Sequence, residues 1–363
     1  MNEKSRNDGL AVFIMAGGAG TRFWPLSTRE RPKQFMQVFD DRSLLQKSYD
    51  RIADIIPAER LFVLTNDRYT DLASQQLPGI PSENIIGEPE RKDTAAAVCL
   101  GALIARKRFG NPVMVVLTAD HIIEPVELFR RTLLSAIDRT REEPALYTFG
   151  IRPTFPASSY GYLEVGRKRA DDEGIEHFQV VSFREKPAPE LARRYLKSGR
   201  YLWNSGMFVW TVDAILQELK QYLPEHVDRL ERAVENFDGP LWVQSLRSAF
   251  TDLKRISIDF AVMEKARDVR CVAGEFLWKD VGGWSAFQEL LPADDSGNHI
   301  RGDAHVLDAR DNLLYCDNSE ETVVLAGVER LVIVRAGNRT LIASKDRLED
   351  LKDVVETMTE RGE

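Results

Sequence analysis

The chain has 363 residues, of which 43% are hydrophobic and 29% are charged, a composition typical of a soluble globular enzyme. Its formal net charge of −8 argues against a nucleic-acid partner, because a duplex-binding surface needs an excess of basic residues. The three cysteines are widely separated and no apolar run is long enough to cross a bilayer, so we expect no zinc site, no disulfide framework and no membrane partner. The polar N-terminus lacks the apolar segment of a signal peptide, which predicts a cytoplasmic protein.

A glycine-rich loop follows the first apolar run, residues 10–15, which has the composition of a buried strand. Glycines beyond the carboxyl end of a strand let backbone N–H groups surround a phosphate. A guanidinium at Arg22 can bind phosphate oxygens in pairs, and Lys33 adds a mobile point charge. The pattern favours a bound triphosphate, with nucleotide contacts expected from Ala16, Gly17, Gly18, Gly20, Thr21, Arg22 and Lys33.

Three other interpretations of this loop are weaker. A dinucleotide site needs a small residue where Phe23 stands, and Pro25 interrupts the helix that should follow. A P-loop needs Gly-Lys-Ser/Thr at the end of the glycine run, which this chain lacks. A turn without a ligand is the commonest meaning of a lone glycine cluster, but the flanking Arg22 and Pro32-Lys33 favour phosphate.

Several motifs in this region are similar to those of a known family. Residues 17–22, Gly-Gly-x-Gly-Thr-Arg, followed by Pro-Leu-Ser and by residues 32–35, Pro-Lys-Gln-Phe, resemble the signature of sugar-nucleotide pyrophosphorylases. The form of residues 23–27, Phe-Trp-Pro-Leu-Ser, resembles the mannose-1-phosphate guanylyltransferases among them. Further matches, given below, extend this resemblance over nearly the whole chain.

The N-terminal half alternates apolar strands with helical patterns, which predicts a mostly parallel sheet covered on both faces. A helix is expected over residues 43–52, with Ser43 as its N-cap. In such sheets ligands bind outside the carboxyl ends of the strands, where the loops of interest should converge. The expected strands after the first cover residues 61–65, 84–87, 113–117 and 145–149.

The segment after the strand at 84–87 starts an apolar helix. Asp93 or Thr94 could simply cap this helix. The resemblance implies that the helix start lies beside the nucleotide, which makes Thr94 a nucleotide-binding candidate. Guanine offers N–H donors, so its pocket needs acceptors, and Glu88 is a candidate, although a surface glutamate is an equal alternative.

Asp120 follows the strand at 113–117 and is placed to hold Mg²⁺ beside a triphosphate. An N-cap role is less favoured, because the next helix is expected several residues later, from Pro125. The family usually has proline where Thr118 stands, a departure that leaves Asp120 in place.

The middle of the chain predicts a mixed part of the sheet, with strands over residues 160–165, 178–183 and 207–210. By themselves, Glu185 and Lys186 form a surface charge pair of little energetic value, and the Asn-Ser-Gly at residues 204–206 is a tight turn. The resemblance implies a sugar-phosphate site formed by Gly161, Glu185, Lys186 and Asn204.

Residues 211–266 have apolar positions at helical spacing, which predicts core helices, and no role is assigned to Asp259. Asp280 could cap the helix that runs through Phe287. The resemblance instead makes Asp280 the second Mg²⁺ ligand, so that carboxylates from both halves of the chain hold one ion.

The last part of the chain, after a polar linker at residues 294–298, has short strands punctuated by Asn, Asp and Gly. It resembles the small left-handed β-helix of the family, which often mediates dimers, so a homodimer is expected. Longer members carry an isomerase domain beyond this region, an activity not expected here. The predicted fold is α/β, with a Rossmann-like nucleotidyltransferase domain over residues 1–290 and a β-helix-like domain over residues 291–363.

The resemblance implies transfer of GMP from GTP to mannose 1-phosphate, with catalysis by Arg22, Lys33, Asp120 and Asp280. The nucleophile is already an ionised phosphate, so no general base is needed. Two alternatives remain open: another nucleotide or sugar 1-phosphate as substrate, and a non-catalytic relative that binds GTP or GDP-mannose.

Overall fold

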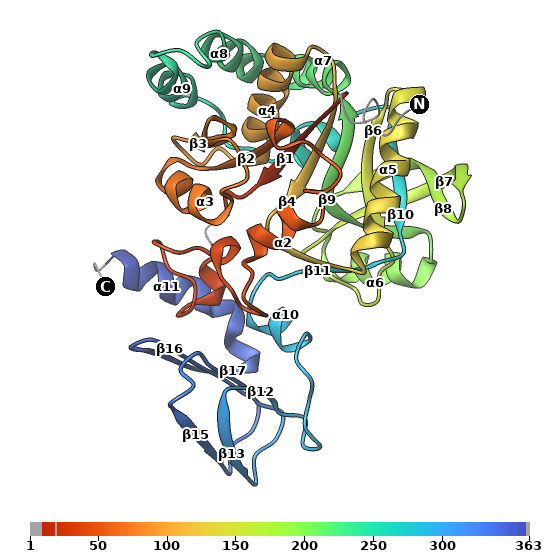
Figure 1. Ribbon diagram of the computed structural model, residues 1–363. Coiled ribbons are helices and arrows are strands. Elements are labelled where there is room, and N and C mark those ends of the chain that lie inside the picture. The colour runs from red at the N-terminus through yellow and green to blue at the C-terminus, as the bar shows by residue number, and fades with distance from the viewer. Residues whose placement is uncertain (1–8, 19, 361–363) are drawn as a thin grey trace. The chain divides into compact units, whose positions relative to one another are not determined.

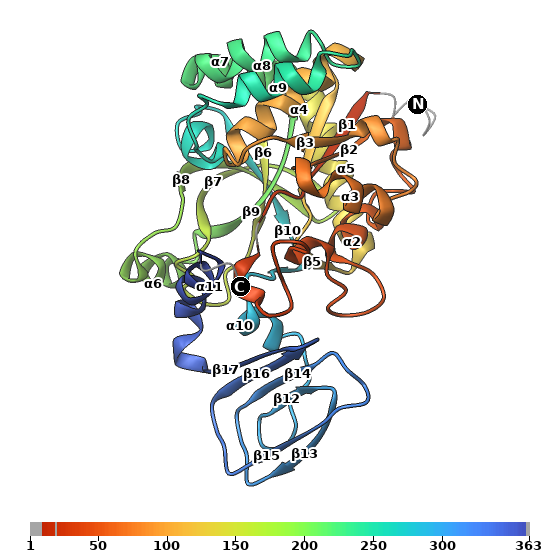
Figure 2. The same ribbon diagram turned by 90° about the vertical axis from the view of Figure 1, so that its left-hand side faces the viewer.

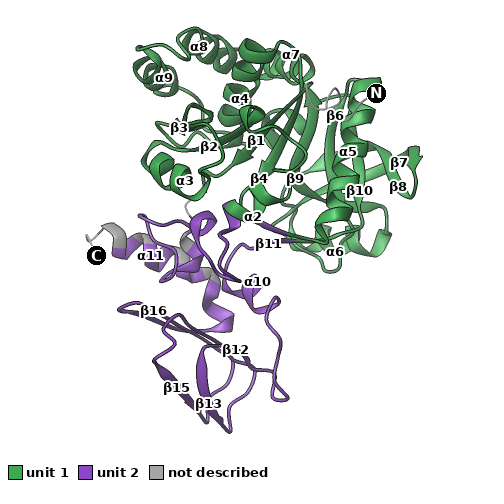
Figure 3. Ribbon diagram, in the orientation of Figure 1, with its two compact units in different colours: residues 1–17, 46–119, 123–278 green, residues 18–45, 120–122, 279–363 purple. Residues whose placement is uncertain are grey.

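The computed structural model describes residues 9–18 and 20–360, apart from the side chains of Thr21, Glu349, Lys352, Glu356, Thr359 and Glu360. The chain forms two compact units that are interleaved along the sequence (Figure 3). Unit 1 contains the chain up to residue 17 together with residues 46–119 and 123–278. Unit 2 contains residues 18–45, 120–122 and 279 onward. The domain boundary predicted at residue 290 stays a prediction.

Unit 1 is built on one mixed sheet, whose described strands have the order β3-β2-β1-β4-β9-β6-β10-β8-β7 (Figure 1). The first four strands of this order are parallel to one another, and so are β6 and β10, while β7, β8 and β9 pair with their neighbours in antiparallel fashion. The α/β class and the mixed sheet are therefore confirmed. The strands are β1 (Leu10–Met15), β2 (Leu61–Asn66), β3 (Ile85–Glu88), β4 (Val113–Thr118), β6 (Leu146–Ile151), β7 (Gly161–Asp172), β8 (Ile175–Arg184), β9 (Tyr201–Thr211) and β10 (Val269–Gly274).

Helices cover both faces of this sheet, as Figures 1 and 2 show together. On one face α4 is buried almost all round, because its alanine-rich sequence lets it pack closely between the sheet and other helices. On the other face α5 brings Phe129 against Phe149 of β6, with ring centroids 6.1 Å apart. The helices are α2 (Leu44–Asp50), α3 (Thr70–Gln76), α4 (Thr94–Phe109), α5 (Val126–Glu142), α6 (Pro189–Ser198), α7 (Val212–Tyr222), α8 (Pro224–Val234) and α9 (Trp242–Phe250).

Unit 2 holds a coil of short parallel strands. Strands β12, β14 and β16 stack in parallel, as do β13 and β15, and β17 closes the stack in antiparallel fashion. Asparagines tie successive turns together: Asn312 donates to Asn298 at 2.9 Å and accepts from the Leu331 amide at 2.9 Å. The predicted β-helix-like part is confirmed. Its strands are β12 (His299–Arg301), β13 (Asp303–Leu307), β14 (Leu313–Cys316), β15 (Thr322–Ala326), β16 (Leu331–Ala336) and β17 (Arg339–Ser344).

Unit 2 also contains α10 (Trp284–Gln288) and α11 (Leu351–Glu360). An aromatic core fixes the glycine-rich loop within this unit. Phe23 lies edge-on against Trp284, with centroids 5.1 Å apart, and the Trp284 indole donates to the Trp24 carbonyl at 3.0 Å. The loop is therefore anchored on the segment that follows Asp280.

Two further strands, β5 (His121–Glu124) and β11 (Leu277–Asp280), form a two-stranded sheet that the sequence did not suggest. The chain passes from one unit to the other within each of them. Asp120 comes just before β5, and Asp280 ends β11. Among the described residues, no helix has the length and apolar character needed to cross a membrane.

Candidate active site

The glycine-rich loop begins where β1 ends. The Ala16 amide donates to the Leu64 carbonyl at 2.7 Å, and the Ala16 carbonyl accepts from the Thr65 hydroxyl at 2.9 Å. Next to it, Gly17 has no side chain toward Glu88: a Cβ there would lie 3.5 Å from Glu88 Oε2. The first turn of the loop is thus held by β2, and a carboxyl group lies beside it.

The rest of the loop closes on the short 3₁₀ helix Lys33–Phe35. Gly20 has φ +63°, and a Cβ at this position would come within 2.8 Å of the Lys33 Cβ, so only glycine fits. The Ser27 hydroxyl donates to the Gly20 carbonyl at 2.6 Å, and the Gln34 amide donates to the Gly18 carbonyl at 3.0 Å. Thr21 starts a second 3₁₀ helix, Thr21–Phe23, which carries Arg22.

Three of the residues predicted to be catalytic meet at one point in unit 2. The Lys33 Nζ lies 2.8 Å from Asp120 Oδ2 and 3.5 Å from Asp280 Oδ1. It also donates to the Val281 carbonyl at 3.1 Å. Lys33 is buried, whereas the side chain of Asp120 is 27% exposed and that of Asp280 is 31% exposed. The fourth residue, Arg22, is exposed. It lies beside the same segment: a Cβ built on Gly282 would be 3.7 Å from Arg22 Nη1 and 3.8 Å from Asp280 Oδ2.

We call Arg22, Lys33, Asp120 and Asp280 the charged cluster. Burial alone would lower the pKa of Lys33, but the carboxylates of Asp120 and Asp280 outweigh it, and the net pKa is raised. Burial would raise the pKa of Asp120, but the Lys33 ammonium, helped by His121, lowers it to about 2. Lys33 is therefore fully protonated and Asp120 fully ionised at neutral pH.

Neither aspartate of the cluster caps a helix. The N-cap of α10 is Gly283, and α5 begins after Pro125. The helix-cap interpretation of Asp280 is thus ruled out, as is that of Asp120. The His121 ring lies 3.6 Å from Asp120 and does not extend the acidic pair to a third ligand. In the described part of the chain no group of three or more His, Cys, Asp or Glu side chains could hold a metal.

An acidic pair of this kind fits Mg²⁺. This ion is bound by oxygen, commonly from one or two carboxylates, and takes its other ligands from substrate phosphates and water. Asp120 and Asp280 supply two such carboxylates, both held near a single cationic nitrogen. They suit a hard divalent ion and do not suit a closed, all-protein zinc site.

A second cluster lies in unit 1, and we call it the sugar cluster after the ligand that the family resemblance implies for its first four members: Gly161, Glu185, Lys186, Asn204 and Asp259. Gly161 opens β7 opposite Asn204 on β9, and a Cβ on this glycine would overlap Glu185 Oε2. The Lys186 ammonium lies 2.6 Å from Glu185 Oε1, and the Glu185 amide donates to Glu264 at 2.9 Å. The lysine has φ +45°, a strained conformation for a long side chain.

The orientation of the Asn204 amide is fixed from both sides. Its oxygen accepts from the buried Thr148 hydroxyl at 2.7 Å, and its nitrogen donates to Asp259 Oδ1 at 3.0 Å. Burial, together with the charge of Glu185, raises the pKa of Asp259 to about 7. The carboxyl group therefore sits at the edge of ionisation near neutral pH.

Sequence reasoning missed Asp259. It starts a one-turn π-helix, Asp259–Met263, which is a rare element that often occurs at functional sites. The apolar spacing of residues 256–263 indicated only core packing, and three of the five π-helix residues are indeed buried. The available signal was the lone carboxylate within this apolar run, because a buried acid needs a specific partner.

Glu88 is the last residue of β3, and its Oε1 is buried with no hydrogen-bond partner among the described residues. Burial raises its pKa to about 8, although Arg91 opposes the shift. The helix α4 is capped by Asp93, not Thr94. The Thr94 hydroxyl instead accepts from the Ile258 amide at 2.9 Å, which ties the start of α4 to the residue before Asp259.

Comparison with known proteins places the chain in a family. A model of the nucleotidyl transferase family matches residues 11–296, and one of the MannoseP isomerase/GMP-like beta-helix domain matches residues 302–358. The mannose-1-phosphate guanylyltransferase of Klebsiella pneumoniae is 38% identical over 350 residues, which are 96% of this chain and 73% of that protein. That of Escherichia coli K12 is 36% identical over 358 residues, 97% of this chain and 74% of the relative.

A solved structure, described as mannose-1-phosphate geranyltransferase from Thermus thermophilus, matches with a TM-score of 0.85 at 32% identity, covering 97% of this chain and 99% of the other. The similarity thus extends over both family domains and does not depend on the glycine-rich loop alone. This chain therefore belongs to the nucleotidyl transferase family and, within it, to the mannose-1-phosphate guanylyltransferases.

Proposed function

We propose that this nucleotidyltransferase transfers GMP from GTP to mannose 1-phosphate, releasing pyrophosphate and forming GDP-mannose. Its named relatives support this activity. The single observation that carries the proposed mechanism is the ammonium of Lys33 held between the carboxylates of Asp120 and Asp280. Such a group of charges suits a polyanionic substrate that is bound together with a divalent ion.

The reaction needs positioning and charge neutralisation more than proton transfer. A phosphate oxygen of mannose 1-phosphate forms a bond to the α-phosphorus of GTP. The bond from that phosphorus to the oxygen bridging the α- and β-phosphates breaks, and the electron pair leaves with pyrophosphate. The nucleophile is ionised at neutral pH, so no side chain has to remove a proton.

We assign the charged cluster to the phosphates. The exposed guanidinium of Arg22 and the amides of the glycine-rich loop would bind the leaving pyrophosphate, and Lys33 would offset charge at the α-phosphate. Asp120 and Asp280 would hold Mg²⁺, which when bound neutralises phosphate charge as a Lewis acid. Without these cations, charge repulsion would oppose the approach of the sugar phosphate to the triphosphate.

We assign the sugar cluster to mannose 1-phosphate. The Glu185 carboxylate can accept hydrogen bonds from sugar hydroxyls, and Lys186 can bind the phosphate. Asn204, whose amide is oriented by Thr148 and Asp259, can donate its remaining N–H to the sugar. The missing side chain at Gly161 leaves the Glu185 carboxylate room in this arrangement.

We assign Glu88 to guanine. The base presents N1–H and an exocyclic amino group. The Glu88 carboxyl group lies beside Gly17 through Oε2, and its Oε1 is an acceptor without a partner among the described residues. Donors from the base would favour the ionised carboxylate, which burial disfavours in the free protein. GTP binding should therefore release a proton at pH values below the pKa of this group in the free protein, about 8.

The test is a product assay. The chain is incubated with Mg²⁺ and each pairing of GTP, ATP, CTP or UTP with mannose, glucose or galactose 1-phosphate, and both pyrophosphate and the sugar nucleotide are quantified. We expect GTP with mannose 1-phosphate to give the highest kcat/KM. A higher kcat/KM with another pair would assign the protein to those substrates instead. Tight GTP binding without any release of pyrophosphate would identify a non-catalytic relative.

We also propose, from the family resemblance, that the protein is a homodimer and works in the cytoplasm. Sedimentation equilibrium of the whole chain tests the oligomer.

A further inference from the structure

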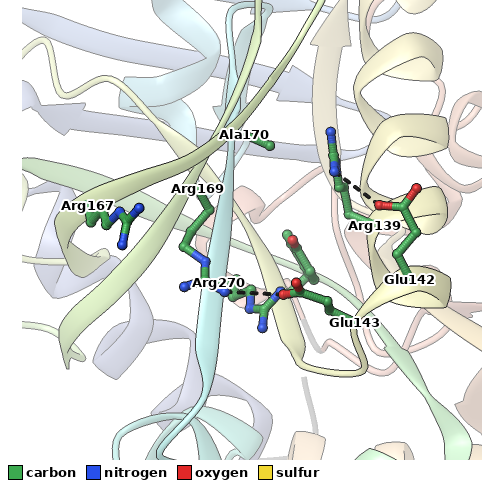
Figure 4. A pocket seen from close by; sticks show the side chains of 8 residues that line it. Arg139, Glu142, Glu143, Arg167, Arg169, Ala170 and Arg270 are labelled. Atoms are coloured by element: carbon green, nitrogen blue, oxygen red, sulfur yellow. Dashed lines mark hydrogen bonds and ion pairs between the residues drawn. The ribbon is translucent and has the colours of Figure 1, made fainter.

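A cavity of about 270 Å³ lies in unit 1, lined by residues of α5, β6, β7 and β10 (Figure 4). Its lining is rich in arginine and has no part in the proposed reaction. Figure 4 shows Arg169 and Arg270 converging on Glu143, and Arg139 meeting Glu142 on the helix side. The lining residues are Arg139, Glu142, Glu143, Tyr147, Arg167, Arg169, Ala170 and Arg270.

The lining has more cations than anions, with four guanidinium groups and two carboxylates. Both carboxylates are already engaged: Glu142 accepts from Arg139 at 3.0 Å, and Glu143 accepts from Arg169 at 3.2 Å and also from Arg270. Among the described residues, the Arg167 guanidinium has no ion-pair or hydrogen-bond partner. Two acids outside the lining are also engaged, because Arg139 donates to Asp172 and Arg270 donates to Asp268. The donors left for a ligand are therefore mainly those of Arg167 and Arg169.

Two residues of the lining are buried, and one of them is held firmly in place. Arg270 is 8% exposed and Tyr147 is 1% exposed, yet both line the cavity. The side chains of Asp268 and Arg270 meet through two nitrogen–oxygen pairs at 3.2 Å, which fixes the plane of the guanidinium. Burial would lower the pKa of Arg270, but its bonds to Asp268, Tyr147 and Glu143 raise it, so the group stays charged.

We propose that this arginine cavity is an anion-binding site for a phosphate group, carried either by inorganic phosphate or by a small sugar phosphate. Guanidinium groups bind phosphate oxygens in pairs, and here they come from three separate elements around one space. The volume is just below the range of ordinary ligand pockets, about 300–1,000 Å³, so a small phosphate ester suits it better than a whole nucleotide. None of the residues that line this cavity belongs to the charged cluster or to the sugar cluster.

The test is calorimetric titration of the whole protein with inorganic phosphate at saturating GTP, which occupies the glycine-rich loop. We expect the wild-type chain still to bind phosphate. Replacing the two exposed arginines of β7, as Arg167→Ser with Arg169→Ser, should weaken this binding about tenfold or more, since each removes charge-assisted hydrogen bonds. A second titration with glucose 6-phosphate, whose phosphate is not on C1, decides between the free anion and a sugar ester as the preferred ligand.

The matched control is Arg131→Ser with Arg232→Ser, which removes the same charge from exposed positions on α5 and α8. It should change phosphate affinity less than about twofold, apart from the general effect of net charge. Equal binding by the β7 variant and the wild-type chain would overturn the proposal. So would complete loss of phosphate binding when GTP saturates the wild-type protein, because the anion would then belong to the glycine-rich loop.

Discussion

The ammonium of Lys33 and the carboxylate of Asp120 form an ion pair, with Nζ and Oδ2 2.8 Å apart, in which the lysine is buried and the aspartate is partly exposed. The two residues belong to loops that are distant in sequence, and each is held in its charged form by the other. An ion pair of this kind adds little to stability, because desolvation offsets much of its attraction. We therefore interpret it as charge placed for a substrate rather than as a structural contact.

Lys33→Ala should lower kcat about 100-fold, because one positioned charge stabilises the transition state by about 3 kcal/mol. The loss of unfolding free energy should be smaller, about 1–3 kcal/mol, since the remaining carboxylates stay partly exposed to water. Steady-state kinetics and urea denaturation measure the two quantities. Lys220→Ala, an exposed lysine on α7, is the control and should leave both unchanged. A variant that unfolds without losing turnover in its folded fraction would contradict the prediction.

Glu88→Gln should weaken the preference for GTP over ITP, which lacks the exocyclic amino group. The ratio of the two kcat/KM values should fall about tenfold or more, the value of a hydrogen bond to a charged group. Glu90→Gln, two residues further along the chain and ion-paired to Lys92 at 2.9 Å, is the control and should keep the wild-type ratio. An unchanged ratio in Glu88→Gln would remove this residue from guanine recognition.

Gly161→Ala should raise the KM for mannose 1-phosphate about tenfold while leaving that for GTP unchanged, because the added methyl group would displace the Glu185 carboxylate. Gly9→Ala is the matched control, since its new Cβ would be no closer than 3.7 Å to another residue. If Gly161→Ala raised both KM values equally, the effect would be general damage rather than loss of sugar contacts.

Asp259 should make stability depend on pH. Its pKa in the folded protein is about 7, raised from 3.8, so the folded state keeps a proton that the unfolded chain has lost within this window. The free energy of unfolding should therefore fall as pH rises from about 4 to about 7, by up to ~1.4 kcal/mol per pH unit. Asp259→Asn should abolish this part of the slope and be the more stable chain at pH 8.

Denaturation curves of wild type, Asp259→Asn and the control Asp213→Asn, an exposed acid on α7, measure this slope. The control should follow the wild-type curve. If the free energy of unfolding had the same pH dependence in wild type and Asp259→Asn, the Asp259 carboxyl group would be ionised throughout this range. Its contact with Asn204 would then not depend on pH.

Sequence patterns predicted the strands well where burial was continuous, as in β1 and β4, because a long apolar run has few alternatives. The strand before it also indicated Asp120, whereas Asp280 was expected from the family resemblance alone, because its position in the sequence was equally consistent with a helix cap. What they could not predict was the interleaving of the two units, which depends on long-range packing such as that of Phe23 on Trp284. The short strands β5 and β11 were not predicted from the sequence for the same reason.

The sugar cluster shows a different limit. Glu185, Lys186 and Asn204 were expected from resemblance, but their spacing gave no reason to bring them together with Asp259. Only the antiparallel pairing of β7 with β9 and the π-helix at Asp259 do so. Local propensity carries no information about such contacts. They become visible only in the structure, for example as the hydrogen bond between Thr148 and Asn204.

The most direct test of the charged cluster is the Mg²⁺ dependence of GDP-mannose formation at saturating GTP and mannose 1-phosphate. It should be measured for wild type, Asp120→Asn, Asp280→Asn and the exposed control Asp295→Asn. We predict that chelation abolishes turnover in all four, and that each cluster variant needs more Mg²⁺ and still turns over about 100-fold more slowly than the control. Turnover by Asp120→Asn or Asp280→Asn within about threefold of wild type at saturating Mg²⁺ would contradict the account.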